Sequence, residues 1–108
     1  MWVFLNDAML SIVAQPAHPG LLLVRARSAG DIERVFPDAE VSETTTADYR
    51  YRAEVPTETV ADALAAEVRA IRYPNFKMTV SDAGRLHAYH DVWEVMARYQ
   101  EVKHPRDR

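Results

Sequence analysis

The sequence predicts an α+β fold built on an antiparallel sheet of about five strands. Runs of strand length occur in five places, and two longer segments carry apolar residues at helical spacing. From Leu21 onward the expected order is strand, helix, strand, strand, helix. That order matches most of a ferredoxin-like unit, with an added N-terminal hairpin and a long C-terminal helix.

The first two strands are expected in "MWVFL" and "AMLSIVA", which are separated by Asn6 and Asp7. Asn and Asp tolerate the positive backbone angles of a tight two-residue turn, so the pair predicts a hairpin. After "QPAHPG" interrupts the chain, "LLLVRAR" predicts a third strand. Its alternation places Leu22, Val24 and Ala26 on one face.

Residues 28–37 predict a short helix that begins with Ser28 or Asp31 as N-cap and ends before Pro37. "AEVSETTT" predicts a weak, acidic edge strand, and "DYRYRAEV" predicts a stronger strand. The helix should turn Ile32, Val35 and Phe36 inward, and the stronger strand should place Tyr49, Tyr51, Ala53 and Val55 on the core face.

Two further helices are expected in the second half of the chain. Thr57 is the predicted cap of the first, which should end at Tyr73 because Pro74 follows. Ser81 or Asp82 caps the second, which runs to about Val102. The first helix carries an apolar stripe of Val60, Leu64, Val68 and Ile71.

The last helix has an unusually broad apolar surface. At 100° per residue its apolar side chains cover an arc of roughly 220°. A helix this apolar should contact either two parts of its own domain or its domain and a partner. We expect Trp93, Tyr89 and Met96 to pack on one side against the sheet or a subunit interface, so that Trp93→Ala leaves the protein unfolded or aggregated. The arc holds Leu86, Ala88, Tyr89, Val92, Trp93, Val95, Met96, Ala97, Tyr99 and Val102, of which Tyr89, Val92, Val95, Met96 and Tyr99 are the predicted interface residues.

Composition predicts one domain over residues 1–103 and a flexible tail at 104–108, since 48% of the 108 residues are hydrophobic and 27% are charged. A net charge of −3 argues against a whole-domain polyanion binder but allows a local basic patch. The absence of cysteine excludes disulfides and thiol chemistry and fits a cytoplasmic protein. The apolar start is too short and too interrupted to span a membrane, so no membrane association is expected.

Four arginines are expected on one face of the sheet: Arg25, Arg27, Arg50 and Arg52. The favoured interpretation is a solvated face on which they pair with acidic neighbours. A phosphate or nucleic-acid site, with Trp2 or Phe4 as a stacking ring, and a protein-binding face both stay open.

Other polar groups point less clearly to chemistry. His87, His90, Asp91 and Glu94 share one helix arc and could hold a divalent metal, but the spacing matches no metalloenzyme motif and a solvated face is favoured. No metal and no cofactor is therefore predicted. The sequence also lacks a Gly-rich phosphate loop and a nucleophile elbow, so no catalytic residue is predicted.

The run that contains Tyr73, Asn75, Phe76 and Lys77 is distinctive. Its rings most simply fill a gap between helices, with Asn75 bonding its own backbone in the turn. The alternative is a recognition loop in which Asn75 and Lys77 bind a ligand.

The segments "MWVF", "LLLVRAR", "DYRYRAEV", "YPNFK" and "HDVW" together resemble a family of small uncharacterised bacterial proteins of about this length. Many of those proteins carry Gly-Phe-Phe or a similar aromatic set where this chain has Asp7, Ala8 and Met9. The resemblance implies no activity, cofactor or catalytic residue.

The leading functional hypothesis is a small, non-enzymatic, cytoplasmic protein-interaction module that could form a homodimer. A nucleic-acid or nucleotide binder that uses the arginine-bearing sheet face is the alternative. A third hypothesis is a phage or mobile-element inhibitor, because "DAEVSETTTAD" offers an acidic strip of Asp38, Glu40, Glu43 and Asp48.

Overall fold

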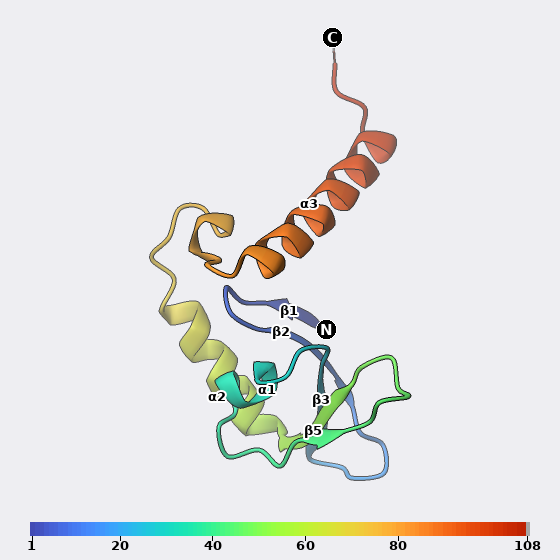
Figure 1. Ribbon diagram of the computed structural model, residues 1–108, viewed down its shortest axis with the longest axis vertical. Coiled ribbons are helices and arrows are strands. Elements are labelled where there is room, and N and C mark those ends of the chain that lie inside the picture. The colour runs from blue at the N-terminus through green and yellow to red at the C-terminus, as the bar shows by residue number, and fades with distance from the viewer. Residues whose placement is uncertain (108) are drawn as a thin grey trace. The chain divides into compact units, whose positions relative to one another are not determined.

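The computed structural model describes residues 1–107 and has an α+β fold. The chain folds into two compact units, Met1–Arg72 and the residues from Tyr73 onward. The first unit holds a five-stranded antiparallel sheet and two helices, and the second holds a short 3-10 helix and the long C-terminal helix (Figure 1). The α+β class and the sheet of five strands are confirmed. One domain over residues 1–103 and a flexible tail stay predictions.

Every pair of neighbouring strands in the sheet is antiparallel. The spatial order is β1-β2-β3-β5-β4, so β5 lies between β3 and β4. The acidic edge strand is confirmed as β4, which has only two residues and leaves little free edge for another chain to pair with. The strands are β1 (Trp2–Phe4), β2 (Met9–Ala14), β3 (Leu21–Ala26), β4 (Ser42–Glu43) and β5 (Tyr51–Pro56).

The connection between β1 and β2 departs from the predicted turn geometry. The Leu5 N–H donates to the Ala8 carbonyl at 2.7 Å, which closes the connection around Asn6 and Asp7. Neither Asn6 nor Asp7 has a positive φ, so the predicted positive backbone angles are wrong. The Asp7 carboxylate instead accepts a hydrogen bond from Arg34. This bond links the β1–β2 connection to the helix that contains Arg34.

The first helix, α1 (Asp31–Val35), begins differently from the prediction. Its N-cap is Gly30, and neither Ser28 nor Asp31 caps it. Gly30 has a φ of 90°, a conformation in which an L side chain would be strained. Asp31 is instead the first helical residue, and its buried carboxylate accepts the Met9 N–H at 3.0 Å. The carboxylate therefore ties α1 to the first residue of β2.

The second helix, α2 (Thr57–Arg69), follows β5 without a loop. Pro56 is its N-cap and Thr57 is its first residue, so the predicted Thr57 cap is wrong. The Thr57 hydroxyl instead donates to the Gly20 carbonyl at 3.2 Å, as does its backbone N–H at 3.0 Å. These two bonds join the start of α2 to the residue before β3.

The predicted end of α2 at Tyr73 is also wrong. The guanidinium of Arg72 donates to the carbonyls of Arg69 and Ile71, and these bonds satisfy backbone acceptors just where the helix stops. The first half of the predicted stripe faces the core, since Val60 is a buried core residue and Leu64 packs against the core cluster. Val68 and Ile71 are exposed.

The hydrophobic core lies between one face of the sheet and helices α1 and α2. The predicted alternation of β3 is confirmed, because Val24 and Ala26 are fully buried and Leu22 packs beside them. The nine buried core residues are Leu10, Ile12, Val24, Ala26, Ile32, Phe36, Ala53, Val55 and Val60.

The second unit contains η1 (Lys77–Thr79) and α3 (Ala83–Lys103). Asp82 caps α3 by accepting the Arg85 N–H at 2.8 Å, as predicted. The Asn75 turn is also confirmed, since its side-chain carbonyl accepts the Lys77 N–H at 3.0 Å. The Phe76 ring lies 5.9 Å from that of Tyr89 and nearly parallel to it, so the connector packs on α3.

Most of the large side chains in the apolar arc of α3 are exposed in the single chain, and the predicted contact of this arc with a partner stays a prediction. Tyr89 is buried, but the Trp93 side chain is 56% exposed. The hydrophobic pattern identifies side chains that gain by leaving water, yet it does not identify what covers them. The other exposed members are Val92, Val95, Met96, Tyr99 and Val102.

Candidate functional site

A row of directly paired residues crosses all five strands on the face opposite the core. Directly opposite residues of paired strands point to the same side of a sheet. Arg25 and Arg52 are neighbours in this row and therefore share a face, as predicted. Trp2 stands at the end of the row and is 68% exposed. From edge to edge the row is Trp2, Ser11, Arg25, Arg52 and Ser42.

Tyr49 lies with the arginines and not on the predicted core face. The guanidinium carbons of Arg25 and Arg27 lie 4.4 and 4.2 Å from the centre of its ring. Tyr49 lies two residues before β5 begins at Tyr51, so the strand alternation that predicts a core position does not apply to it. The Asp48 carboxylate accepts its N–H at 2.8 Å and fixes this backbone.

The guanidinium groups around Tyr49 donate to acceptors of their own unit. Arg25 donates to the buried Ser11 hydroxyl at 2.8 Å, and Arg27 donates to the Asp48 carbonyl at 2.9 Å. Arg52 donates to the Tyr49 carbonyl at 3.4 Å and lies 3.6 Å from the Asp48 carboxylate. We call Arg25, Arg27, Tyr49 and Arg52 the arginine–tyrosine cluster.

Arg50, the fourth predicted arginine, pairs with an acidic side chain of β4. Its Nε lies 3.4 Å from the Glu43 carboxylate at the β4 edge. Glu43 and Asp48 each contact an arginine, so two of the four residues of the predicted acidic strip carry a neighbouring positive charge.

The second unit has a polar cluster built on Trp93. The Lys77 ammonium lies 4.5 Å from the centre of the Trp93 ring and 3.4 Å from His90 Nδ1. The His90 ring stacks on Trp93 at 5.8 Å, and its Nε2 lies 3.1 Å from the Glu94 carboxylate. Of the two predicted ligand-binding residues of this segment, Lys77 is held over α3 and Asn75 bonds its own turn.

The four acidic and histidine side chains considered for a metal form two separate pairs. His87 lies 3.7 Å from Asp91, and His90 lies 3.1 Å from Glu94. Among residues 1–107, no group of three or more His, Asp or Glu side chains is placed to hold a metal ion.

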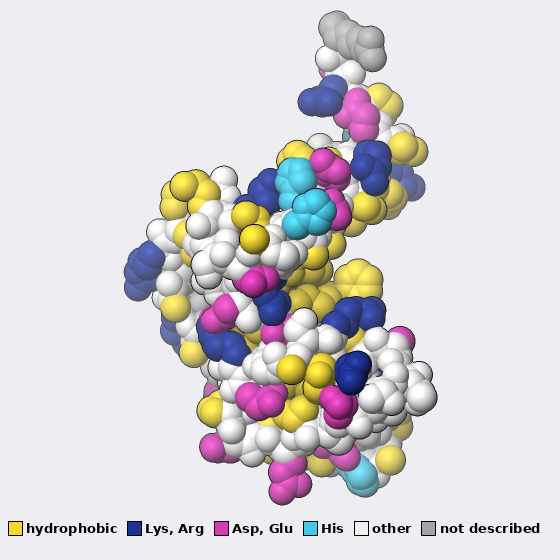
Figure 2. Space-filling model, in the orientation of Figure 1, with side chains coloured by type: hydrophobic (Ala, Val, Ile, Leu, Met, Phe, Trp, Pro, Cys, Tyr) yellow, Lys and Arg dark blue, Asp and Glu magenta, His cyan; other side chains and the backbone are white. Residues whose placement is uncertain are grey.

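Five large apolar side chains form an exposed stripe along α3. Their exposed fractions lie between 42% and 81%. Figure 2 shows hydrophobic side chains along this helix, with histidine and acidic groups on another side of it. Four of the five predicted interface residues belong to the stripe, and the fifth, Tyr89, is buried. We call Val92, Val95, Met96, Tyr99 and Val102 the α3 stripe.

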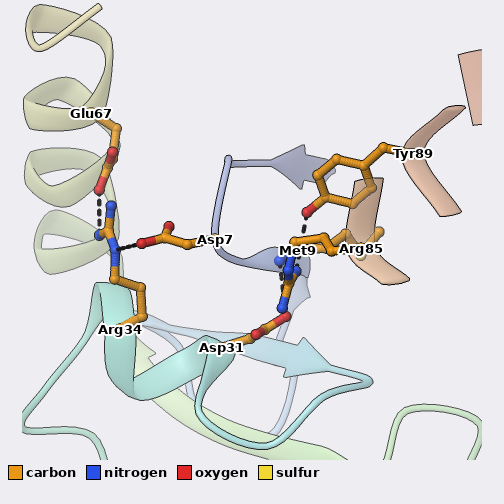
Figure 3. Close-up of polar contacts among 7 residues, drawn as sticks. All are labelled: Asp7, Met9, Asp31, Arg34, Glu67, Arg85 and Tyr89. Atoms are coloured by element: carbon orange, nitrogen blue, oxygen red, sulfur yellow. Dashed lines mark hydrogen bonds and ion pairs between the residues drawn. The ribbon is translucent and has the colours of Figure 1, made fainter. Parts of the chain in front are cut away.

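An ion-pair cluster in the first unit was not predicted. Arg34 of α1 contacts Asp7 at 2.7 Å and Glu67 of α2 at 2.6 Å (Figure 3). The hydrogen bonds that Arg34 donates to Glu67 and then to Asp7 raise its pKa above the usual value, so Arg34 stays charged. These residues are 27 and 33 positions apart, and no local pattern connects them. The cluster joins three elements of the fold.

Figure 3 also shows two further polar links. The Asp31 carboxylate accepts the Met9 N–H in the first unit. In α3, the Arg85 guanidinium donates to the Tyr89 hydroxyl at 3.1 Å, one helical turn away. Both links position backbone or side chains within their own unit.

Comparisons of the chain with models of protein families, with curated proteins and with solved structures found no match. The resemblance to small bacterial proteins therefore stays a prediction. Within residues 1–107, none of the helices combines the length and the apolar character needed to cross a bilayer.

Proposed function

We propose that this protein is a small, non-enzymatic, cytoplasmic interaction module that self-associates through the α3 stripe. The observation that carries the proposal is the exposure of five large apolar side chains on one helix. Removing apolar surface from water contributes about 25 cal/mol per Å², so a surface of this kind favours association.

The spacing of the stripe supports a helix as the partner. Val92, Val95, Tyr99 and Val102 follow one another at intervals of three, four and three residues. That spacing is typical of the seam along which two helices pack in a coiled coil. The partner that supplies a matching helix most simply is a second copy of the chain.

Sedimentation velocity over a range of protein concentrations tests the proposal. We expect the wild-type protein to sediment faster as its concentration rises, and Val95→Glu to remain monomeric because it places a charge in the seam. Ala97→Glu is the matched control, since it adds the same charge to an exposed position on the opposite side of α3. A wild-type monomer at high micromolar concentration would contradict self-association. Equal association of wild type and Val95→Glu would exclude the stripe.

For the first unit we propose a ferredoxin-like unit with an added N-terminal hairpin. The proposal is supported by the position of β5 between β3 and β4, which is where a split β-α-β arrangement requires the intervening strand. The antiparallel pairing of β1 with β2 supports the hairpin. An experimental structure in which β3 pairs directly with β4 would contradict this architecture.

Nucleic-acid or nucleotide binding by the sheet face is the second candidate function. The exposed Trp2 ring in one row with Arg25 and Arg52 favours it, because stacking rings beside cations suit single strands. It ranks second because the three arginines of the cluster already donate to acceptors of their own unit.

Fluorescence anisotropy with a labelled single-stranded oligonucleotide tests this candidate. Binding should weaken as salt rises and should be reduced by Trp2→Ala and Arg27→Gln but not by Arg50→Gln. Absence of binding at low salt would exclude it.

A further inference from the structure

We propose that α3 pairs with α3 of a second copy in the antiparallel direction, with Val92 of one copy facing Val95 of the other. The two-fold axis then passes between Trp93 and Glu94. This inference rests on the proposed function and specifies the partner surface and its orientation.

The seam positions fit an antiparallel pair. In the heptad defined by the α3 stripe, Val92 and Tyr99 occupy the first core position, and Val95 and Val102 occupy the second. In an antiparallel pair each first core position faces a second core position. With Val92 opposite Val95, Tyr99 faces Ala88 of the second copy and Val102 faces Arg85, whose guanidinium donates to Tyr89 of its own helix. Ala88 is exposed and small, so the large ring has room beside it.

The charges that flank the seam select this direction. Asp91 and Arg98 each precede a first core position, and both are exposed. In the antiparallel pair centred between Trp93 and Glu94, Asp91 of each copy lies beside Arg98 of the other. Two opposite-charge pairs then border the seam, one on each side of the axis.

The competing arrangements place like charges together. In a parallel pair in register, Arg98 lies beside Lys103 of the second copy, twice over. In a second antiparallel register, the two-fold axis lies at Ala97, half a heptad further along α3. Arg98 then lies beside Arg98 of the second copy. The contact between His87 and Asp91 is long, at 3.7 Å, and Asp91 keeps most of its carboxylate accessible for a new partner.

Engineered disulfides test the orientation directly, because the chain contains no cysteine of its own. Ala88→Cys and Tyr99→Cys are prepared as separate single variants, then mixed and oxidised. The antiparallel pair brings residue 88 of one copy beside residue 99 of the other. Like positions are then separated along the axis by about 16 Å, far beyond disulfide reach. Only the mixture should form a cross-linked dimer. Val102→Cys alone is a control that should stay uncrosslinked in this arrangement.

A charge exchange tests the same geometry without cysteine. Asp91→Arg and Arg98→Asp should each weaken self-association about tenfold, because each converts two attractive pairs into two repulsive ones. The double variant should recover wild-type association. Sedimentation equilibrium of all four proteins gives the comparison.

The outcomes separate this inference from the proposed function. Cross-links in the mixture alone, together with recovery in the double variant, support the antiparallel pair. Cross-links within Ala88→Cys alone and within Tyr99→Cys alone overturn the direction but leave self-association through α3 standing. Monomeric behaviour of the wild type and no cross-links overturn both.

Discussion

Helices α2 and α3 both carry apolar residues at helical spacing, but they use them differently. α2 packs Val60 and Leu64 against a sheet in its own unit. α3 buries Tyr89 and exposes the α3 stripe. The difference shows that an amphipathic pattern predicts a helix that needs a covering surface, and that the location of this surface is a separate question. For α3 we propose that the surface is another α3.

The largest expected effect on stability concerns the core of the first unit. Leu10 is fully buried between the sheet and the helices. Leu10→Ala should lower the free energy of unfolding by about 3 kcal/mol, because it removes buried methyl groups and leaves a cavity. Urea denaturation measures the change. Val102→Ala, at the most exposed position of the α3 stripe, is the control and should leave the unfolding of dilute protein nearly unchanged.

A smaller loss is expected at the arginine–tyrosine cluster. Tyr49→Leu removes the ring that lies against two guanidinium groups, and it should lower stability by about 1.5 kcal/mol in urea denaturation. Tyr49→Phe retains the ring and should be close to wild type. Equal losses in the two variants would show that the hydroxyl, and not the cation–ring contact, is what matters.

The ion-pair cluster should contribute less. Arg34→Gln removes the contacts to Asp7 and Glu67 and should reduce stability by about 1 kcal/mol at low salt. Because all three side chains are partly exposed, the difference from wild type should shrink as salt screens the charges. A difference that does not change with salt would indicate lost packing in place of lost charge pairing.

The smallest effect is expected at Trp93, where the sequence predicted the largest. Trp93→Ala removes a half-exposed ring and its contacts with Lys77 and His90. The loss of stability in dilute protein should be below about 1 kcal/mol. Thermal melting of Trp93→Ala, compared with thermal melting of Leu10→Ala, checks this expectation. If Trp93→Ala unfolds as readily as Leu10→Ala, the exposed position of the ring is wrong.

The sequence was informative where one local pattern determines the structure. The alternation of β3, an acidic edge strand within "AEVSETTT", the Asp82 cap and the Asn75 turn were all predicted and observed. Each depends on residues within a few positions of one another, which a single sequence displays.

Features that depend on distant partners could not be predicted in this way. Tyr49 contacts Arg25 and Arg27 because the chain bends before β5. The regular alternation of "DYRYRAEV" gives no indication of this bend. Thr57 bonds Gly20 across 37 positions in place of capping its own helix. Arg25 and Arg52 were placed on the correct face, but what each one contacts depends on the tertiary structure.

Amide hydrogen exchange at low and high protein concentration tests the central claim most directly. If the α3 stripe is the surface of self-association, amides within residues 92–102 should exchange more slowly as concentration rises. Those of the sheet core, including Leu10 and Val24, should not change. Concentration-independent exchange in α3, or slowing confined to residues 1–72, would contradict the account.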